Sequence, residues 1–240
     1  MFNLSKKNII VTGSNQGIGF EIARKLYELD CNIIRIDQIF LKKKNYFFND
    51  YKFDLNNYEK IPSLVNKIIL KFKRIDGLIN NAGVSYHKNY SLKAIKKTMR
   101  INLLANYALT QAVCKNMSRF KKGSIINITS LGANFGFKLN PGYQMSKAGL
   151  QQLSRSVAID WGEKGIRCNS IMPGYIETGM TKKSKINKKH YKERLNKMII
   201  KRWGKPEDLV GACIFLLSEE SSYITGIELK VDGGWSIKGL

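Results

Sequence analysis

Residues 8–30 read NIIVTGSNQGIGFEIARKLYELD, and this stretch decides the fold. Residues 8–12 are apolar and mostly β-branched, which predicts a short buried strand. A glycine-rich turn follows, and the apolar positions of residues 20–30 then repeat at helical spacing. A strand, a tight glycine turn and a helix in this order are typical of the first unit of a parallel α/β sheet.

Strand-like and helical patterns alternate along the rest of the chain. We predict further strands at residues 31–37, 51–55, 75–83, 123–130, 166–174 and 226–234, and helices at residues 58–72, 91–117, 146–162 and 206–218. Apolar strands that alternate with amphipathic helices require a parallel sheet covered on both faces. The predicted fold class is therefore α/β, a three-layer Rossmann-type doubly wound parallel sheet. No linker or repeat divides residues 1–240, so we predict a single domain.

The composition excludes several classes of protein. No stretch approaches the roughly 18 apolar residues of a membrane span, and the first residues lack a cleavage-type signal, so we expect a cytoplasmic protein with no membrane partner. The four cysteines form no C-x-x-C pair and lie in apolar segments, which indicates reduced packing residues. His87 and His190 have no neighbouring ligands at metal-binding spacing, so no metal site is expected.

The charge is strongly positive, with 41 Lys and Arg against 18 Asp and Glu and a formal net charge of +23. Such a charge favours anionic partners in general. The basic residues are spread along the whole chain, however, and no zinc-finger spacing or aromatic RNA-binding signature accompanies them. We therefore interpret the charge mainly as a compositional bias and predict no specific nucleic-acid binding.

The turn from Thr12 to Gly19 has the features of a dinucleotide-binding loop. Gly13 allows the sharp turn, Gly17 lets a pyrophosphate approach the backbone, and Gly19 permits close helix packing. The free amides and the dipole of the helix start favour phosphate groups. Asp37 ends the second strand, where a carboxylate hydrogen-bonds ribose hydroxyls and repels a 2′-phosphate, so the sequence favours NAD. The neutral Gln38 agrees with NAD, whereas the nearby Arg35 keeps NADP open.

Together with this turn, a series of motifs resembles the short-chain dehydrogenase/reductase family in its one-domain branch. The resemblance extends over nearly the whole chain and is carried by the Asp54–Leu55 pair, the NNAG of Asn80–Gly83, Asn102, Ser130, the Y-x3-K pair Tyr143 and Lys147, the PG of Pro173–Gly174 with Thr178, and the VDGG of Val231–Gly234. The resemblance implies an NAD(P)-dependent oxidoreductase that transfers a hydride between a nicotinamide cofactor and a secondary alcohol or ketone.

The chemistry of hydride transfer explains why these residue types are needed. The substrate oxygen must gain or lose a proton as the hydride moves, so the site needs an acid/base group of tuned pKa. A Tyr143 phenol serves if its pKa falls from about 10 by about 3 units, which corresponds to roughly 4 kcal/mol. Lys147, one helical turn further on, and an oxidised nicotinamide both favour the phenolate. Ser130 then donates a hydrogen bond to the substrate oxygen.

The resemblance implies further roles. Lys147 also binds the nicotinamide ribose, and Asn102 holds a water that connects Lys147 to solvent. The catalytic residues it implies are Asn102, Ser130, Tyr143 and Lys147. The cofactor-binding residues are Gly13, Ser14, Gln16, Gly17, Ile18, Gly19, Asp37, Asp54, Leu55, Asn81, Ala82, Gly83, Tyr143, Lys147, Pro173, Gly174, Ile176 and Thr178.

Residues 179–203 form a long polar segment where such a fold carries a mobile lid over the substrate. Residues 182–202 contain ten basic residues and one acid, which suggests an anionic substrate such as a phosphorylated or carboxylated sugar-like alcohol, or a substrate carried by an acidic protein. A solvated helix surface is the simpler interpretation of the same charge.

Two alternatives to this dehydrogenase stay open. A 3-oxoacyl-carrier-protein reductase fits the resemblance, but it usually uses NADPH and would prefer a basic residue at Gln16. A non-catalytic cofactor-binding regulator would show damage at the catalytic positions, and none is visible. The resemblance also implies a homotetramer or homodimer built on the long central helices and the C-terminal strand region.

Overall fold

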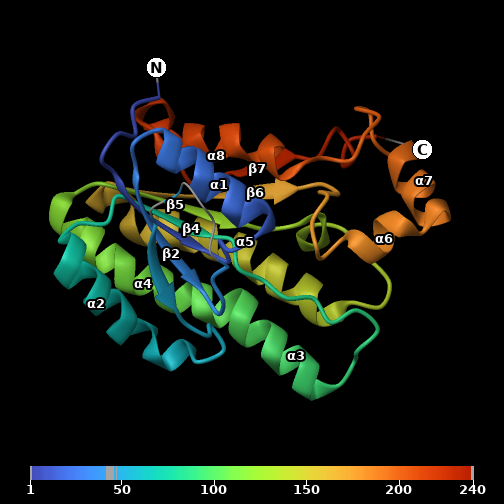
Figure 1. Cartoon of the computed structure of the whole chain (residues 1–240), viewed down its shortest axis with the longest axis horizontal. Helices are drawn as coiled ribbons and strands as arrows, with labels where there is room; N and C mark the ends of the chain where they lie inside the picture. Colours follow the sequence, from blue (N-terminus) through green and yellow to red (C-terminus); the bar gives the residue numbers. More distant parts are fainter. Residues whose placement is uncertain (1, 42–45, 47, 239–240) are drawn as a thin grey trace.

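A seven-stranded parallel sheet forms the centre of the molecule in the computed structural model, which describes residues 2–41, 46 and 48–238 (Figure 1). The strands are β1 (Asn8–Thr12), β2 (Asn32–Asp37), β3 (Asn49–Lys52), β4 (Gly77–Asn80), β5 (Gly123–Ile128), β6 (Ile166–Pro173) and β7 (Glu228–Val231). Their order is β3-β2-β1-β4-β5-β6-β7, and every neighbouring pair is parallel.

Helices cover both faces of the sheet. They are α1 (Gly17–Glu28), α2 (Ile61–Phe72), α3 (Leu92–Met99), α4 (Ala105–Met117), α5 (Pro141–Trp161), α6 (Lys182–Ile186), α7 (Lys188–Asn196) and α8 (Val210–Leu217). Short 3-10 turns lie at Tyr58–Lys60, Ser118–Phe120, Leu131–Ala133, Gly162–Lys164, Pro206–Leu209 and Glu219–Ser221. In Figure 1, α1 and α8 lie above the sheet, and α2 and α4 lie below it.

Successive residues of the central strands supply two separate cores. Ile10 and Leu78 point to the face covered by α2, α4 and α5, whereas Val11 and Ile79 point to the face covered by α1 and α8. All four side chains are fully buried. Apolar residues on both faces of a strand are what a doubly covered parallel sheet demands, so the predicted α/β fold class is confirmed.

The boundaries differ from the sequence prediction in several places. The third strand is Asn49–Lys52 rather than residues 51–55, and the first helix already begins at Gly17. The helix α5 begins at Pro141, five residues before the predicted start, because proline suits the first turn of a helix. Tyr143 therefore lies inside the helix that carries Lys147, in its first turn.

The helix predicted over residues 91–117 is helical from residue 92 to residue 117, but it is not α-helical throughout. Residues Arg100–Leu104 form a π-helical turn between α3 and α4, and the Ala105 amide bonds to the Arg100 carbonyl five residues earlier. The sequence did not reveal this turn, because no Gly or Pro marks it within residues 100–104. Asn102 lies in the middle of the π-turn.

The connections create a crevice at one edge of the sheet. After β3 the chain crosses to β4 on the other side of β1, so the loops after β1 and β4 leave in opposite directions. Ligands of such sheets bind beyond the carboxyl ends of the strands at this point. Within the described ranges, no helix combines the length and the apolar character that crossing a bilayer requires.

Candidate active site

A cleft of about 350 Å³ opens at the carboxyl ends of the strands. The predicted site residues that line it are Gly13, Gln16, Gly17, Ile18, Asp37, Leu55, Asn81, Ala82, Gly83, Ser130, Tyr143, Lys147, Pro173, Gly174, Ile176 and Thr178. These residues come from the ends of different strands and from α5, so the fold brings together positions that are up to 165 residues apart in sequence, from Gly13 to Thr178.

Four predicted site residues do not line the cleft. The Ser14 hydroxyl donates to the Val11 carbonyl, and Gly19 packs against the Gly13 carbonyl. Asp54 accepts a hydrogen bond from the Gln38 side chain at 2.8 Å. Asn102 is fully buried beside Gly83. Ser14, Gly19 and Asn102 are buried and support the cleft wall, whereas Asp54 is exposed beside Gln38, which lines the cleft.

Hydrogen bonds lock the glycine turn to the loop after β4. The Thr12 hydroxyl accepts from the amides of Asn81 and Ala82, each at 3.0 Å. The Asn81 side chain in turn donates to the carbonyls of Thr12 and Gly13, also at 3.0 Å. Gly13 has a φ of +62°, and an added Cβ would lie 2.8 Å from the Ala82 Cα, so only glycine fits there.

The acidic residue Asp37 faces the glycine turn from the end of β2. Its carboxylate accepts from the Asn15 amide at 2.9 Å and from the Gln38 amide at 2.7 Å. Arg35, by contrast, is 3% exposed and does not line the cleft. Both oxygens of Asp50 pair with its guanidinium, which also lies over the rings of Phe40 and Phe48.

Ser130 and Tyr143 meet on the far side of the cleft. Burial raises the pKa of the Tyr143 phenol, and a hydrogen bond with Ser130 lowers it. The sequence reasoning expected a pKa below the ordinary value, but in this structure the cost of desolvation outweighs the hydrogen bond. The neighbouring Thr129 hydroxyl donates to the Ile171 carbonyl at 3.0 Å and is 3.0 Å from Glu228, away from Tyr143.

The ammonium group of Lys147 lies next to this pair. Its side chain is 3% exposed, and Nζ lies 5.8 Å from the centre of the Tyr143 ring. Nζ donates to the Ile128 carbonyl at 2.6 Å, which leaves donor capacity for other groups. Burial lowers the pKa of Lys147 to about 8. Because this pKa is so close to neutrality, neighbouring charges readily change the protonation state of Lys147.

Asn102 lies on the other side of Gly83 from the glycine turn. Its Oδ1 accepts from the Val84 amide at 2.8 Å, and its Nδ2 donates to the Val84 carbonyl at 2.9 Å. A Cβ added to Gly83 would lie 3.5 Å from Asn102 Oδ1 and 3.6 Å from Lys147 Nζ. The polar ends of Asn102 and Lys147 thus face the same small space.

Several lining residues were missed by the sequence reasoning. They are Ile36, Gln38, Phe53, Val84, Ile101, Ile128 and Thr129, whereas Gly179, Met180 and Thr181 lie at the start of the predicted lid, residues 179–203. Most of the missed residues are sequence neighbours of a predicted motif. They could have been predicted by including one or two more residues beside each motif at the end of its strand. The Thr181 hydroxyl bonds to the Ile176 carbonyl at 2.5 Å and folds the loop after β6 over the cleft.

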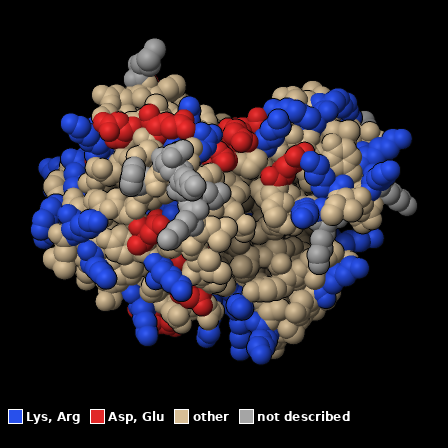
Figure 2. Space-filling view, viewed as in Figure 1, with Lys and Arg blue, Asp and Glu red and all other residues tan. Residues whose placement is uncertain are grey.

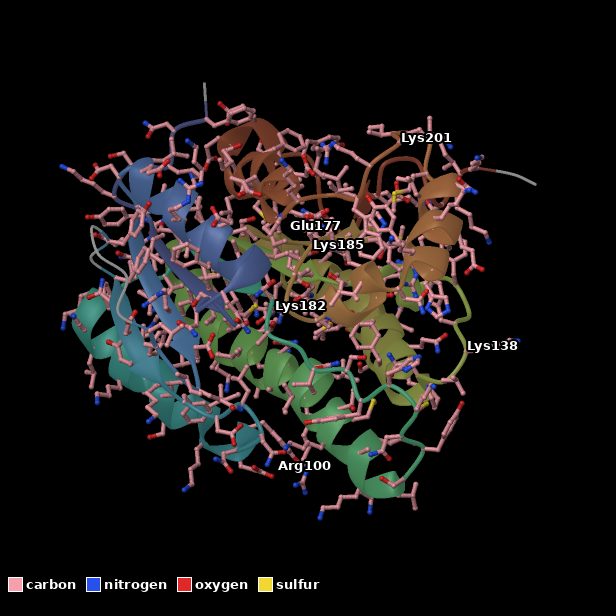
Figure 3. The ribbon with its side chains drawn as sticks, turned by 45° about the vertical axis from the view of Figure 1, so that its right-hand side comes forward. Arg100, Lys138, Glu177, Lys182, Lys185 and Lys201 are labelled. Carbon is pink, nitrogen blue, oxygen red and sulfur yellow. The ribbon has the colours of Figure 1, made fainter. Side chains whose placement is uncertain are left out.

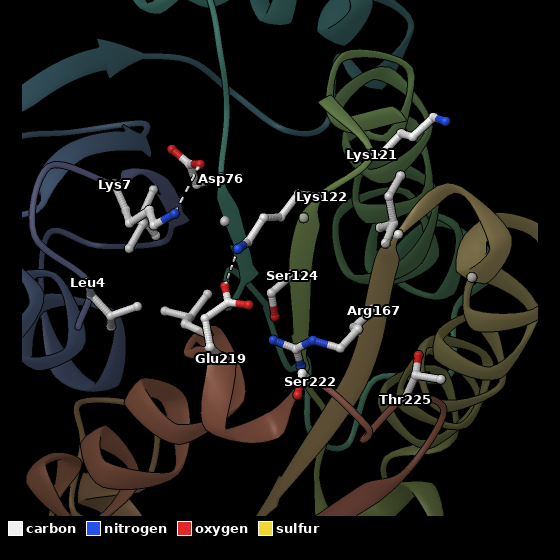
Figure 4. Close-up of a pocket in the computed structure, with 17 residues that line it drawn as sticks. Leu4, Lys7, Asp76, Lys121, Lys122, Ser124, Arg167, Glu219, Ser222 and Thr225 are labelled. Atoms are coloured by element: carbon white, nitrogen blue, oxygen red, sulfur yellow. Dashed lines mark ion pairs between the residues drawn. The ribbon is translucent and has the colours of Figure 1, made fainter. Parts of the chain in front are cut away.

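A second cavity, of about 320 Å³, lies at the amino ends of the strands (Figure 4). Several of its charged groups already have partners, since Lys122 pairs with Glu219 at 2.8 Å and Arg167 donates to the Ser218 carbonyl at 3.0 Å. None of the predicted site residues lines it. The cleft at the carboxyl ends is therefore the candidate active site.

Relatives of known activity match this chain over nearly its full length. A family model described as enoyl-(acyl carrier protein) reductase matches residues 13–236. The 2-dehydro-3-deoxy-D-gluconate 5-dehydrogenase of Escherichia coli is 32% identical and aligns with 98% of this chain and 97% of its own. A 3-oxoacyl-(acyl-carrier-protein) reductase of Buchnera aphidicola is 35% identical, over 96% of this chain and 98% of its own.

Solved structures agree with the sequence matches. A gluconate 5-dehydrogenase from Burkholderia cenocepacia, in complex with NADP and tartrate, superimposes with a TM-score of 0.93 at 26% identity and covers 99% of this chain and 98% of its own. A 4-hydroxyisoleucine dehydrogenase complexed with NADH also gives 0.93, at 30% identity, over 98% of this chain and 100% of its own. The chain therefore belongs to the short-chain dehydrogenase/reductase family and is a nicotinamide-dependent oxidoreductase that acts on CH–OH groups.

Proposed function

We propose that the protein interconverts a polar secondary alcohol and its ketone, with Tyr143 as the acid/base group and an anionic sugar-like compound as substrate. The observation that carries the proposal is the convergence of Ser130, Tyr143 and Lys147 in the same cleft as the glycine turn. Hydride transfer needs this combination, because the substrate oxygen exchanges its proton while the adjacent carbon exchanges its hydride.

The residues of the cleft fit a dinucleotide. The first turn of α1 contains no acidic residue, and no side chain caps it, so its amides are available to phosphate oxygens. A Cβ added at Gly17 would meet only Thr178 atoms, at 3.6 and 3.8 Å, which leaves room for a close approach. Gly13, Gly17 and Ile18 would hold the pyrophosphate, Asp37 and Leu55 the adenosine, and Lys147 and Ile176 the nicotinamide riboside. The bound nicotinamide supplies or accepts the hydride and is cationic when oxidised.

The chain's own groups manage the proton. During oxidation the Tyr143 phenolate takes the proton of the substrate hydroxyl, and during reduction the phenol returns it. The Ser130 hydroxyl donates a hydrogen bond to the same substrate oxygen. The Lys147 ammonium offsets the negative charge of the phenolate. Since burial alone raises the pKa of Tyr143, this positive charge is necessary for the phenolate to form near neutrality.

We propose NAD as the preferred cofactor. Asp37 points its carboxylate to the glycine turn, where the adenosine ribose is expected, and a 2′-phosphate would be repelled there. Arg35, the residue that kept NADP open, is engaged by Asp50 and enclosed by two rings. The similar structures contain both nucleotides, NADP in the gluconate dehydrogenase and NADH in the 4-hydroxyisoleucine dehydrogenase.

The substrate proposal rests on the positive charge of residues 182–202, which directly follow the cleft-lining residues Gly179, Met180 and Thr181. Lys and Arg side chains gather over α6 and α7 at the right of Figure 2. Lys182, Lys185 and Lys201 belong to residues 179–203. Lys185 pairs with Glu177 at 2.6 Å (Figure 3). We propose that residues 179–203 form a mobile lid that closes over an anionic substrate. The sugar-acid dehydrogenases among the relatives support this substrate class.

A carrier-protein reductase is the second candidate, because a relative that is 35% identical has this activity and the basic surface suits an acidic carrier. The neutral Gln16 in the glycine turn and Asp37 speak against its usual NADPH. A non-catalytic regulator has less support, because Asn102, Ser130, Tyr143 and Lys147 are all intact.

We propose in addition that the protein is cytoplasmic, that each chain is a single domain, and that the chains form a homotetramer or homodimer.

The first prediction concerns Tyr143→Phe. The variant keeps the ring but lacks the hydroxyl that exchanges the proton, so we expect kcat to fall by about 1,000-fold or more. Its affinity for NADH, measured by fluorescence titration, should change by less than about 3-fold because the ring still fills the cleft wall. Turnover close to that of the wild type in a screen of gluconate-type secondary alcohols would overturn the mechanism.

The second prediction concerns the cofactor. We expect NADH to bind at least about 10-fold more tightly than NADPH, as a carboxylate facing a 2′-phosphate costs more than 1 kcal/mol. Asp37→Ser should reduce this difference in affinity, whereas Asp160→Asn, which changes an exposed carboxylate near the end of α5 and outside the cleft, should leave it nearly constant. A preference of the wild type for NADPH would contradict the proposal.

The third prediction concerns the anionic substrate. The KM for gluconate and related sugar acids should rise several-fold between about 0.05 and 0.5 M salt, because salt screens attraction by the basic lid. The KM for sorbitol, a neutral polyol of similar size, serves as the control and should stay constant. Equal salt dependence for acid and polyol would remove the electrostatic argument.

The fourth prediction follows from the buried Lys147. Its pKa is about 8 in the folded protein and ordinary in the unfolded chain, so between these values the unfolded chain binds more protons. Stability then rises with pH, and relative to Lys147→Met the wild type should gain about 2 kcal/mol between about pH 7 and pH 9.5. Denaturant unfolding at both pH values measures this difference. A constant difference would mean that Lys147 is not a buried cation near neutrality.

A further inference from the structure

A buried polar cluster joins α4 to α5 directly behind the cleft. Its members Asn102, Asn106 and Ser146 are each fully buried. Buried polar groups cost stability unless they are hydrogen-bonded, and apolar side chains of similar shape would fill the same space. Asn106 and Ser146 each share a hydrogen bond with Asn102, which indicates that the cluster fixes the position of Asn102.

Asn106 holds the main-chain carbonyl of Asn102. Its Nδ2 donates to this carbonyl at 2.7 Å. Asn102 lies in the π-turn, where the regular helical ladder is disturbed and carbonyl directions are less strictly set by it. A side-chain donor one turn further on therefore fixes the direction of the Asn102 carbonyl.

Ser146 holds the side chain of Asn102 from the opposite helix. Its hydroxyl accepts from Asn102 Nδ2 at 3.0 Å and donates to the Tyr143 carbonyl at 2.7 Å. Ser146 lies between Tyr143 and Lys147 on α5, so this hydroxyl links the π-turn to the backbone of the helix that carries both residues. The amide of Asn102 cannot rotate without breaking this link.

We propose that Asn106 and Ser146 are positioning residues that clamp Asn102 at its backbone and its side chain, so that its Oδ1 stays turned to the space shared with Lys147. The proposal rests on the proposed function of Tyr143 and Lys147. With the clamp in place, Oδ1 of Asn102 supports the charged form of Lys147. The charged Lys147 in turn favours the Tyr143 phenolate.

Asn106 has a feature that separates this role from a structural one. Its Oδ1 is buried and has no hydrogen-bond partner among the described residues. Asn106→Leu, which is similar in shape, removes this unpaired acceptor together with the donor to the Asn102 carbonyl, so the two effects oppose each other and the stability should change little. A loss of activity without a loss of stability is then the signature of positioning.

The expected effect appears in the pH profile. Without the clamp Lys147 loses support for its charge, its pKa falls further, and the Tyr143 phenolate becomes harder to form. For Asn106→Leu and Ser146→Ala, the pH of half-maximal alcohol oxidation should therefore rise by about one unit. We expect kcat at neutral pH to fall roughly 10-fold, with KM and NADH affinity nearly constant.

Matched variants make the experiment specific. Ser146→Thr keeps the hydroxyl and should retain the wild-type profile. Thr110→Val removes a fully buried hydroxyl one turn beyond Asn106, which bonds to Asn80 and not to Asn102, and should also leave the profile unchanged. All variants are compared by thermal unfolding and by the pH dependence of kcat. If Asn106→Leu does not fold, Ser146→Ala and Ser146→Thr still test the clamp.

The outcomes are distinct. A shifted profile in Asn106→Leu and Ser146→Ala, with the two control variants unchanged, supports the clamp. Wild-type profiles in both clamp variants, measured alongside an inactive Tyr143→Phe, overturn the clamp and leave the proposed function standing. An active Tyr143→Phe overturns both. A profile shift in Thr110→Val equal to that in Asn106→Leu would show a general effect of core substitution and would also overturn the clamp.

Discussion

The hydrogen-bonded lock between the loops after β1 and β4 is the constraint on which the site depends. Thr12 and Asn81 are joined by hydrogen bonds between β1 and β4, where the strand order of the sheet changes direction. Gly13 lies so close to Ala82 that no side chain fits between them. This contact fixes the glycine turn relative to Gly83, behind which Asn102 and Lys147 meet. The cleft is thus a product of backbone packing, and the functional side chains are added to a rigid edge.

Charge balance is the second theme of the site. Lys147 is a buried cation whose pKa falls to about 8, and burial also raises the pKa of Tyr143. Desolvation therefore works against the charged form of both groups, and each charged form is more favourable in the presence of the other. A site of this kind costs stability in the folded protein and provides a phenol whose proton can be controlled by a neighbouring charge.

Much of this arrangement could be predicted from the sequence, because its signals are local. The strand, glycine turn and helix of residues 8–28, the alternating pattern and the spacing of Tyr143 and Lys147 all lie within single segments. The π-turn at Asn102 was not predicted, because no Gly or Pro marks it in the sequence. The pairing of Arg35 with Asp50 depends on the contact between β2 and β3, and the pKa of Tyr143 depends on burial. Such properties arise only when distant segments pack together.

The role of Tyr143 as the acid/base group is tested by an ultraviolet difference titration of tyrosine, with and without NAD, in the wild type and in Tyr143→Phe. With NAD bound, the account predicts that one phenol of the wild type ionises well below the ordinary value of about 10, and that this step is missing in the variant. Identical titration curves of the two proteins below that value in the presence of NAD would contradict it.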